Sequence, residues 1–351
     1  MPKAYILTIS DIVRETPDAV TIRFEQPSFG RIWYYPGQFI TLRVEIDGVN
    51  HYRSYSISSV PQLDKFLSVT VKRVAGGLIS NYIIDHFAPG KKVVVLEPRG
   101  KFYLETGSKN KRHIVLFGAG SGITPLISIL RAVLYQEPAS SVSLFYANRD
   151  EAQVIFGEWL TRLEKQFPQR LKIWYGFSRP DNPLAGNFYQ GRITPEKMPQ
   201  LLAAIAPGEK SIFFLCGPSG YMDAVSQGLA AAGIDKENIH RELFFADKDE
   251  KKLTAAFGPS REVTVMTAGQ TYHLTVPPGT TILDAALSQK VYLPYSCRRG
   301  VCSTCMGTLK SGKVSMDQED ALLDFEKAMG YVLVCQAHPE SDDVCIDIGE
   351  S

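Results

Sequence analysis

The sequence contains little cysteine and has no long apolar run. Six cysteines occur among 351 residues, which is too few for a disulfide-stapled secreted domain. No stretch approaches the roughly 18 consecutive apolar residues that a membrane-spanning helix requires. The first residues, MPKAYILTISDIVRE, are polar every few positions and lack the apolar core of a signal peptide. We therefore expect a protein of the reducing cytoplasm that does not insert into a membrane.

An excess of one charge is also absent. The 38 basic and 37 acidic residues give a formal net charge of +1, so no global field favours nucleic acid or an anionic membrane surface as a partner. Hydrophobic residues make up 44% of the chain and charged residues 21%, which is typical of a globular protein with ample core. The length allows two or three domains.

Four of the six cysteines lie in one segment with the spacing C-x4-C-x2-C-x29-C. They are Cys297, Cys302, Cys305 and Cys335. Zinc sites usually use two short C-x2-C pairs, whereas one tight loop and a distant fourth thiolate is the plant-type spacing of a 2Fe–2S cluster. Buried free cysteines or a zinc site are the alternatives. Cys345 lies outside the pattern and is expected to be a small core residue.

The surroundings of this quartet predict a small domain at residues 261–351. The stretch EVTVMTAGQTYHLTVPPGTTILDAAL reads as two alternating strands joined by a turn, followed by a helix that Thr280 or Thr281 caps. This part of the chain resembles the β-grasp domain of plant-type ferredoxins.

Residues 1–106 are expected to form an antiparallel β-barrel. Short strand patterns separated by Gly or Pro recur here, in AVTIRFEQP, GQFITLRVEI, RSYSISS, FLSVTVKRV and KKVVVLEPRG. The tetrad RSYS at residues 53–56 is a weak signal alone, because alternating polar strands contain such tetrads by chance. Further along, two glycines at 76–77 precede a helix expected to begin near residues 78–80, where backbone N–H groups suit a pyrophosphate.

Residues 110–245 follow another period, in which apolar strands alternate with helical stretches. This alternation predicts an α/β domain with a parallel sheet covered by helices. The first strand runs into GAGSGITP, whose glycines allow a diphosphate to approach the backbone, and Pro125 is expected at the first position of the next helix. The last strand runs into CGPSGYM. Without further context, Cys216 would be an ordinary core thiol.

Together, RSYS, GGLIS, GAGSGITP and CGP resemble the ferredoxin–NADP reductase superfamily over essentially the whole chain. The resemblance implies that Arg53 binds a flavin phosphate, Tyr55 packs on the isoalloxazine and Ser56 hydrogen-bonds near N5. It implies that the flavin pyrophosphate is held by Gly76, Gly77 and Ser80. The G-G-x-x-S pattern of this segment is more similar to the FAD-binding members of the superfamily. FMN is the alternative flavin.

The same resemblance implies a nicotinamide nucleotide on the α/β domain. The residues around it would be Gly118, Gly120, Gly122, Thr124, Pro125, Cys216, Gly217 and Pro218. Thr124 would lie near the nicotinamide, and Cys216 would position the hydride donor at the flavin edge. Ser56 and Cys216 are therefore the expected catalytic residues. Cys216 has no basic neighbour in the sequence that would activate it as a nucleophile.

Two arginines bear on the choice between NADPH and NADH. Arg149 follows the second strand of the α/β domain, and Ser178-Arg179 follow the third, where the adenosine of a dinucleotide sits. Cations there suit the 2′-phosphate of NADPH, and Ser178-Arg179 is similar to the pair that binds it in plant-type reductases. Asp150 and Glu151 are nearby, so NADH is the alternative.

The charge-rich segment 240–262 ends in Gly-Pro-Ser and is expected to contain a linker at residues 246–260. Phe244 or Phe245 is expected to cover the flavin.

The domain order resembles the reductases of multicomponent oxygenases, most closely those of phenylacetyl-CoA epoxidation. It implies electron transfer from NADPH through FAD and the cluster to an oxygenase or similar acceptor protein. The alternatives are a reductase for a desaturase, hybrid-cluster protein or P450, and a non-enzymatic redox-sensing iron–sulfur protein.

Overall fold

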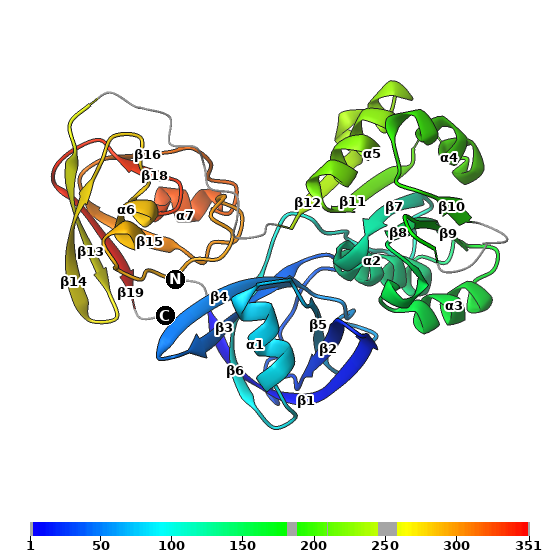
Figure 1. Cartoon of the computed structure of the whole chain (residues 1–351), viewed down its shortest axis with the longest axis horizontal. Helices are drawn as coiled ribbons and strands as arrows, with labels where there is room; N and C mark the ends of the chain where they lie inside the picture. Colours follow the sequence, from blue (N-terminus) through cyan, green and yellow to red (C-terminus); the bar gives the residue numbers. More distant parts are fainter. Residues whose placement is uncertain (1–2, 181–187, 209, 245–257, 350–351) are drawn as a thin grey trace.

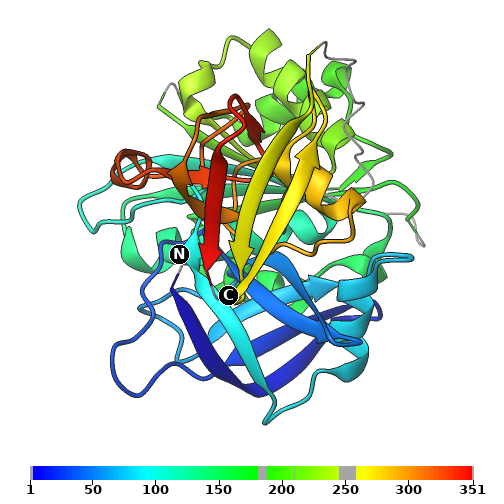
Figure 2. The same cartoon turned by 90° about the vertical axis from the view of Figure 1, so that its left-hand side faces the viewer.

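The computed structural model describes residues 3–180, 188–208, 210–244 and 258–349, which form three domains (Figure 1). We call them the barrel domain, the central domain and the C-terminal domain. The last two lie on opposite sides above the barrel domain in Figure 1, and Figure 2 shows the C-terminal domain in front of the other two. Most of the expected linker lies outside the described residues. Across the described ranges, no helix is long and apolar enough to cross a membrane.

The barrel domain is an antiparallel barrel, as the sequence predicts. Its strands are β1 (Ala4–Thr16), β2 (Ala19–Phe24), β3 (Phe39–Ile46), β4 (Val49–Ser56), β5 (Leu67–Lys72) and β6 (Lys92–Arg99). They pair in the order β4-β3-β6-β1-β2-β5, and a bridge between Ile57 and Val69 joins the two end strands. Helix α1 (Leu78–His86) packs on the barrel through its buried Ile79 and Ile83.

The central domain is a parallel sheet with helices on both faces. Its strands are β7 (His113–Ala119), β8 (Ser141–Asn148), β9 (Leu171–Phe177), β10 (Phe188–Gln190), β11 (Ile212–Gly217) and β12 (Ile239–Leu243), in the order β10-β9-β8-β7-β11-β12. Helices α2 (Ile123–Gln136) and α3 (Gly157–Gln166) cover one face, and α4 (Met198–Ile205) and α5 (Ser219–Ala231) cover the other. Because both faces are buried, a strand such as HIVLFGA is apolar almost throughout.

The barrel and central domains share an apolar core. Phe102 and Leu104, which follow β6, belong to the same buried cluster as Ile127 and Leu130 of α2. The ring of Phe102 meets that of Phe214 in β11 edge to face, with 5.3 Å between their centroids. The C-terminal domain has a core of its own. It is therefore the more separable unit.

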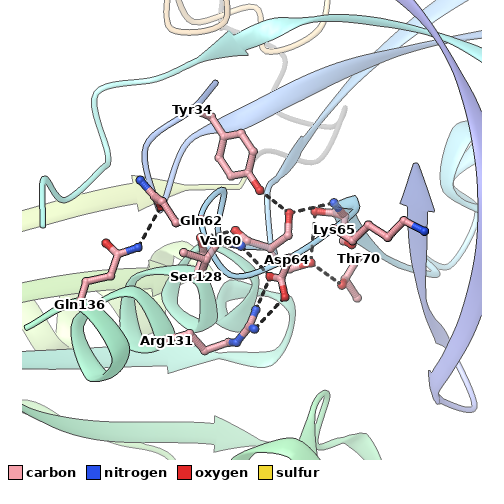
Figure 3. Close-up of polar contacts among 12 residues, drawn as sticks. Tyr34, Val60, Gln62, Asp64, Lys65, Thr70, Ser128, Arg131 and Gln136 are labelled. Carbon is pink, nitrogen blue, oxygen red and sulfur yellow. Dashed lines mark hydrogen bonds and ion pairs between the residues drawn. The ribbon is translucent and has the colours of Figure 1, made fainter. Parts of the chain in front are cut away.

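A buried polar network reinforces the contact between the barrel and central domains. Both guanidinium Nη atoms of Arg131 in α2 donate to the carboxylate of Asp64, at 2.5 and 2.8 Å. The Ser128 hydroxyl donates to the Ser59 carbonyl at 2.7 Å, and the Arg131 guanidinium lies 4.0 Å from the ring centroid of Trp159. Figure 3 shows Ser128 and Arg131 of α2 pointing into the barrel loop that carries Asp64. The network holds α2 at one orientation to the barrel.

The C-terminal domain packs helices on a mixed sheet. Its elements are β13 (Arg261–Thr267), β14 (Gln270–Val276), α6 (Ile282–Ser288), β15 (Met306–Ser311), β16 (Val314–Met316), α7 (Asp324–Ala328), β17 (Tyr331–Leu333), β18 (Ala337–Pro339) and β19 (Val344–Gly349). The main sheet has the order β14-β13-β19-β15-β17. Thr281 caps α6 by accepting a hydrogen bond from the Asp284 N–H at 3.2 Å. Cys345 is only half-buried, because it alternates with the core residues Val344 and Ile346 in β19.

Candidate functional site

The RSYS tetrad forms the end of β4. In the β3–β4 ladder, Arg53 lies opposite Leu42 and Tyr55 lies opposite Ile40. Strand alternation places Arg53 and Tyr55 on one face of β4 and the two serines on the other. Ser56 is buried, whereas Arg53 and Tyr55 are half-buried. The strand therefore presents a cation and an aromatic ring together.

The GGLIS segment forms a tight turn into α1. Gly76 has a φ of +71°, a conformation that suits glycine, and an added Cβ there would have no atom within 4 Å. Gly77 is the N-cap, with no side-chain cap and no acidic residue in the first turn of α1. The Ser80 hydroxyl accepts from the Val74 N–H at 3.2 Å and so fixes the turn. The exposed helix start can receive an anion.

The glycines of GAGSGITP serve two different purposes. An added Cβ at Gly122 would lie 2.1 Å from the Cys216 carbonyl oxygen, and one at Gly118 would lie 3.0 Å from Leu126. Both glycines therefore let the loop pack on the protein itself. Gly120 has a φ of +54° and open space beside its Cα. Of the three glycines, Gly120 leaves the room that a diphosphate would need.

The helix after this loop begins earlier than expected. The loop forms a short 3-10 turn at Gly120–Gly122, and α2 starts at Ile123. Pro125 is the third helical residue, so the expectation that it occupies the first position is wrong. The Thr124 hydroxyl donates to the Ser121 carbonyl at 2.9 Å, which ties the start of α2 to the 3-10 turn. Every residue from 122 to 134 is buried, which holds the start of α2 against the sheet.

The CGP segment ends β11 beside this loop. Cys216 lies opposite Gly118 of β7 on one side and opposite Glu242 of β12 on the other. Burial, and then the charge of Glu242, raise the pKa of the Cys216 thiol well above its usual value. The thiol therefore stays protonated at neutral pH, which agrees with the expectation that it is not a nucleophile. Pro218 then caps α5.

Glu242 connects the two domains, and the sequence analysis did not identify it. The Ser56 hydroxyl at the end of β4 donates to Glu242 Oε2 at 3.1 Å. Burial raises the pKa of the Glu242 carboxyl group to about 8, and the hydrogen bond from Ser56 opposes this rise. Ser56, Glu242 and Cys216 thus lie side by side across the domain boundary. Phe244 follows two residues later and is exposed, whereas Phe245 lies outside the described residues.

Arg149 and Arg179 lie together at the ends of β8 and β9. The Arg179 N–H donates to the Arg149 carbonyl at 2.7 Å, and the Ser178 N–H donates to the Asn148 carbonyl at 3.1 Å. Arg149, Ser178 and Arg179 are exposed. Asp150 is half-buried and caps a short 3-10 turn, where its carboxylate accepts from the Gln153 N–H at 3.2 Å. Of the residues 148–151 and 177–179 at these strand ends, the charged side chains classed as exposed are those of Arg149 and Arg179.

The four cysteines of the C-terminal domain form two adjacent pairs. A hydrogen bond from the Cys302 thiol is the largest cause that lowers the pKa of Cys297 to about 6, with burial opposing it. In the same way, a hydrogen bond from Cys305 lowers the pKa of Cys335. Cys297 Sγ also accepts from the Arg299 N–H at 3.4 Å. The fold thus brings together all four thiols that the sequence singled out.

The cysteine pairs fit a two-metal cluster. Within the described ranges, no group of three His, Cys, Asp or Glu side chains could hold a single metal ion. In a 2Fe–2S cluster, each of the two irons takes only two thiols from the protein, so three side chains need not meet at one point. Gly300, with a φ of +71°, closes the loop tightly, because an added Cβ would lie 2.9 Å from the Gln318 carbonyl oxygen. The donor set and the backbone-lined loop therefore suit a 2Fe–2S cluster better than one zinc ion.

Comparison with known proteins assigns a type to each domain. Residues 7–103 match the oxidoreductase FAD-binding domain family, residues 116–227 match the oxidoreductase NAD-binding domain family, and residues 265–340 match the 2Fe-2S iron-sulfur cluster binding domain family. These matches follow the order of the three domains in the structure.

Relatives match the chain from end to end. The ferredoxin reductase component of 3-ketosteroid-9-alpha-monooxygenase from Rhodococcus rhodochrous is 38% identical, over 98% of this chain and 97% of its own. One component protein of 1,2-phenylacetyl-CoA epoxidase from Escherichia coli is 35% identical, over 99% of this chain and 98% of its own. The structure of phthalate dioxygenase reductase covers 98% of both chains, with a TM-score of 0.60 and 23% identity, and shows the same fold.

Proposed function

The chain belongs to the family of oxygenase reductases that join FAD-binding, NAD-binding and 2Fe–2S domains, and we propose that it carries electrons from NADPH through FAD and the cluster to an oxygenase. FAD, if bound, would supply hydride acceptance and one-electron donation, and a bound 2Fe–2S cluster would supply one-electron transfer. The observation that carries the proposal is the hydrogen bond between Ser56 and Glu242. It places the end of β4 against the strand that flanks CGP.

In this proposal the barrel domain binds FAD. Arg53 binds a flavin phosphate and Tyr55 packs on the isoalloxazine, because both side chains lie on one face of β4. Gly76 and Gly77 let the pyrophosphate approach the start of α1, while Ser80 holds the turn. A pyrophosphate site here favours FAD over FMN.

The central domain binds NADPH with its nicotinamide at Cys216. Gly120 admits the diphosphate, and Gly118, Gly122, Thr124 and Pro125 shape the loop around it. Cys216, Gly217 and Pro218 line the place where the hydride donor meets the flavin edge near Ser56. The thiol of Cys216 is fully buried in the core and protonated, so it supports the proposed ring site from behind and forms no covalent bond to the ring.

The choice of NADPH rests on Arg149 and Arg179. Both are exposed at the proposed adenosine end, where Ser178 directly follows β9 and its N–H donates to the Asn148 carbonyl of β8. An acidic residue that binds both ribose hydroxyls would favour NADH. Asp150 is engaged with Gln153 instead. The two guanidinium groups can bind the charged 2′-phosphate of NADPH. The Asp150 carboxylate, which already accepts a hydrogen bond, is less suited to bind the ribose hydroxyls of NADH.

Phe244 covers the open face of the flavin. It lies two residues beyond Glu242, whose carboxylate receives the Ser56 hydrogen bond. Phe244 is 38% exposed, so its ring is available for stacking.

In the C-terminal domain, the four iron ligands of the proposed cluster are Cys297, Cys302, Cys305 and Cys335.

For the oxygenase partner we propose a phenylacetyl-CoA epoxidase-type system, supported by the 35% identical Escherichia coli protein. A steroid-hydroxylating system is the second candidate, because the Rhodococcus rhodochrous component is 38% identical. Both candidates can be tested by supplying the purified reductase and NADPH to each oxygenase. Product formation with the phenylacetyl-CoA oxygenase alone supports the first candidate, and formation with the steroid oxygenase alone supports the second. Failure with both, while NADPH still reduces the cluster, would contradict both partners.

A further inference from the structure

A chain of hydroxyl groups joins β4, the flavin strand that carries Arg53 and Tyr55, to the cysteine loop that begins at Cys297. Ser54 lies between Arg53 and Tyr55 in β4, and its side chain is on the opposite face from theirs. Its N–H donates to the Ser296 hydroxyl at 3.1 Å, and the two hydroxyl oxygens are also 3.1 Å apart. The Thr41 hydroxyl, opposite Ser54 in β3, lies 2.9 Å from that of Ser54. Ser296 is 6% exposed and directly precedes Cys297.

A second contact joins the same two domains. Arg99, the last residue of β6, donates from Nη2 to Glu326 Oε1 in α7 at 3.0 Å. Glu326 is buried, and its other oxygen accepts from the Leu323 N–H at 2.9 Å, which caps α7. Arg99 also pairs with Glu97 at 2.6 Å. The ion pair is therefore partly desolvated and held in place from both sides.

These contacts differ from those between the barrel and central domains. The latter two share an apolar core that includes Phe102 and Leu104. The C-terminal domain has its own core, and its Ser296 and Glu326 contact the barrel through polar side chains. Interfaces of that kind permit relative motion of domains. Contacts that fix the docked position therefore determine how much of the time the cysteine loop lies beside β4.

We propose that the Ser54–Ser296 hydrogen bond and the Arg99–Glu326 ion pair form a docking clamp that holds the Cys297 end of the cluster loop against the flavin strand. Ser296 is then a positioning residue for electron entry into the cluster. The clamp rests on the proposed function, because it acts on transfer from FAD to the cluster. With both groups bound, that step would move one electron from the reduced flavin to the oxidised cluster, so that the flavin would lose the electron that one ferric ion would gain. Its rate depends steeply on the distance between the two groups.

The first test measures the clamp without using catalysis. Residue-resolved hydrogen–deuterium exchange of the full-length holoprotein reports the Ser54 N–H, which is bonded to Ser296 and not to β3. Ser296→Ala should speed exchange at Ser54 about ten-fold, as expected for one lost hydrogen bond. Ser296→Thr keeps the hydroxyl and should exchange like the wild type. The control Ser315→Ala alters an exposed serine of the same domain and should change nothing at Ser54.

The second test measures the two electron-transfer steps in one stopped-flow experiment with NADPH. Ser296→Ala and Glu326→Gln should leave flavin reduction unchanged and slow the following bleaching of the cluster. Glu326→Gln retains an oxygen that can cap α7, so helix loss would not explain its effect. The double variant should slow cluster reduction more than either single variant. Ser296→Thr should restore the wild-type rate.

The outcomes separate the clamp from the proposed function. Faster exchange at Ser54 together with slower cluster reduction supports the clamp. Equal exchange at Ser54 in the wild type and in Ser296→Ala shows that the contact does not form, and overturns it. Faster exchange with unchanged cluster reduction overturns the positioning role of Ser296. If the wild-type cluster accepts no electron from reduced flavin, the proposed electron path fails and the clamp loses its role with it.

Discussion

The Ser56 hydroxyl of the barrel domain donates to Glu242 Oε2 of the central domain at 3.1 Å. The two residues are 186 positions apart in the chain, and Cys216 lies opposite Glu242 in the neighbouring strand. The contact joins the proposed flavin site to the proposed nicotinamide site. Burial raises the pKa of Glu242 from an ordinary value of 4.5 to about 8, against the hydrogen bond from Ser56, and this shift can be measured.

The first prediction concerns pH and stability. Between about pH 4.5 and about pH 8, the folded chain keeps the Glu242 proton that the unfolded chain releases, so its contribution to folding weakens as the pH rises. Glu242→Gln mimics the protonated form. We expect the free energy of unfolding of the variant to exceed that of the wild type by about 2 kcal/mol at pH 9, with little difference at pH 4. This value is smaller than the whole pKa shift would give, because Glu242 is only half-buried and solvent screens its charge.

Urea unfolding followed by tryptophan fluorescence measures this difference. The three tryptophans, Trp33, Trp159 and Trp174, all lie in the barrel and central domains, so the signal reports those domains alone. Glu237→Gln alters an exposed carboxylate and is the matched control. An identical pH dependence of the unfolding midpoint in Glu242→Gln and the wild type would show that Glu242 carries no raised pKa.

The second prediction contrasts two glycines of one loop. Gly122→Ala places a Cβ 2.1 Å from the Cys216 carbonyl oxygen, so we expect a loss of about 3 kcal/mol or more in unfolding free energy. Gly120→Ala meets no atom but is strained at a φ of +54°, so we expect a loss of about 1–2 kcal/mol. Gly120→Ala should nevertheless weaken NADPH binding, because its methyl group enters the space proposed for the diphosphate. Urea midpoints and nucleotide titration check both. Equal stability losses would contradict the packing role of Gly122.

The third prediction concerns nucleotide choice. A charge-assisted hydrogen bond to the 2′-phosphate contributes roughly 1.5–3 kcal/mol, so Arg179→Ala should raise the KM for NADPH about ten-fold or more. The KM for NADH should change little. Steady-state reduction of ferricyanide with each nucleotide measures both values, and Arg162→Ala in α3 provides a control for loss of a positive charge elsewhere in the domain. Equal effects on NADPH and NADH would mean that Arg179 does not contact the phosphate.

Much of the fold could be predicted from sequence because its signals are local. The β–α alternation of the central domain and the tight cysteine loop depend on neighbouring residues. Strand β1 was not among the predicted strands. It is 13 residues long and pairs with β2 through two register shifts, which interrupt the alternation that marks a strand. Strand β12 was hidden in a charge-rich segment, because an edge strand is only half-buried.

The contacts between domains could not be predicted in this way. Ser54 and Ser296 are 242 positions apart, and Asp64 and Arg131 are 67 positions apart. No local pattern marks either pair, and the residues involved are common surface types. Glu242 gave no sequence signal for the same reason. The position of Pro125 was mistaken because the glycines form a 3-10 turn that starts the helix two residues early.

The central claim is that electrons leave the flavin through the four-cysteine cluster. The most direct measurement is anaerobic mixing of NADPH with the wild type and with Cys335→Ala, following flavin absorbance and the electron paramagnetic resonance of the reduced cluster. We expect the wild type to contain about two irons and two sulfides, and its flavin and cluster to become reduced in turn. Cys335→Ala should lose the cluster signal and cytochrome c reduction, while its flavin is reduced at the wild-type rate. Zinc without sulfide in the wild type, or undiminished cytochrome c reduction by Cys335→Ala, would contradict the account.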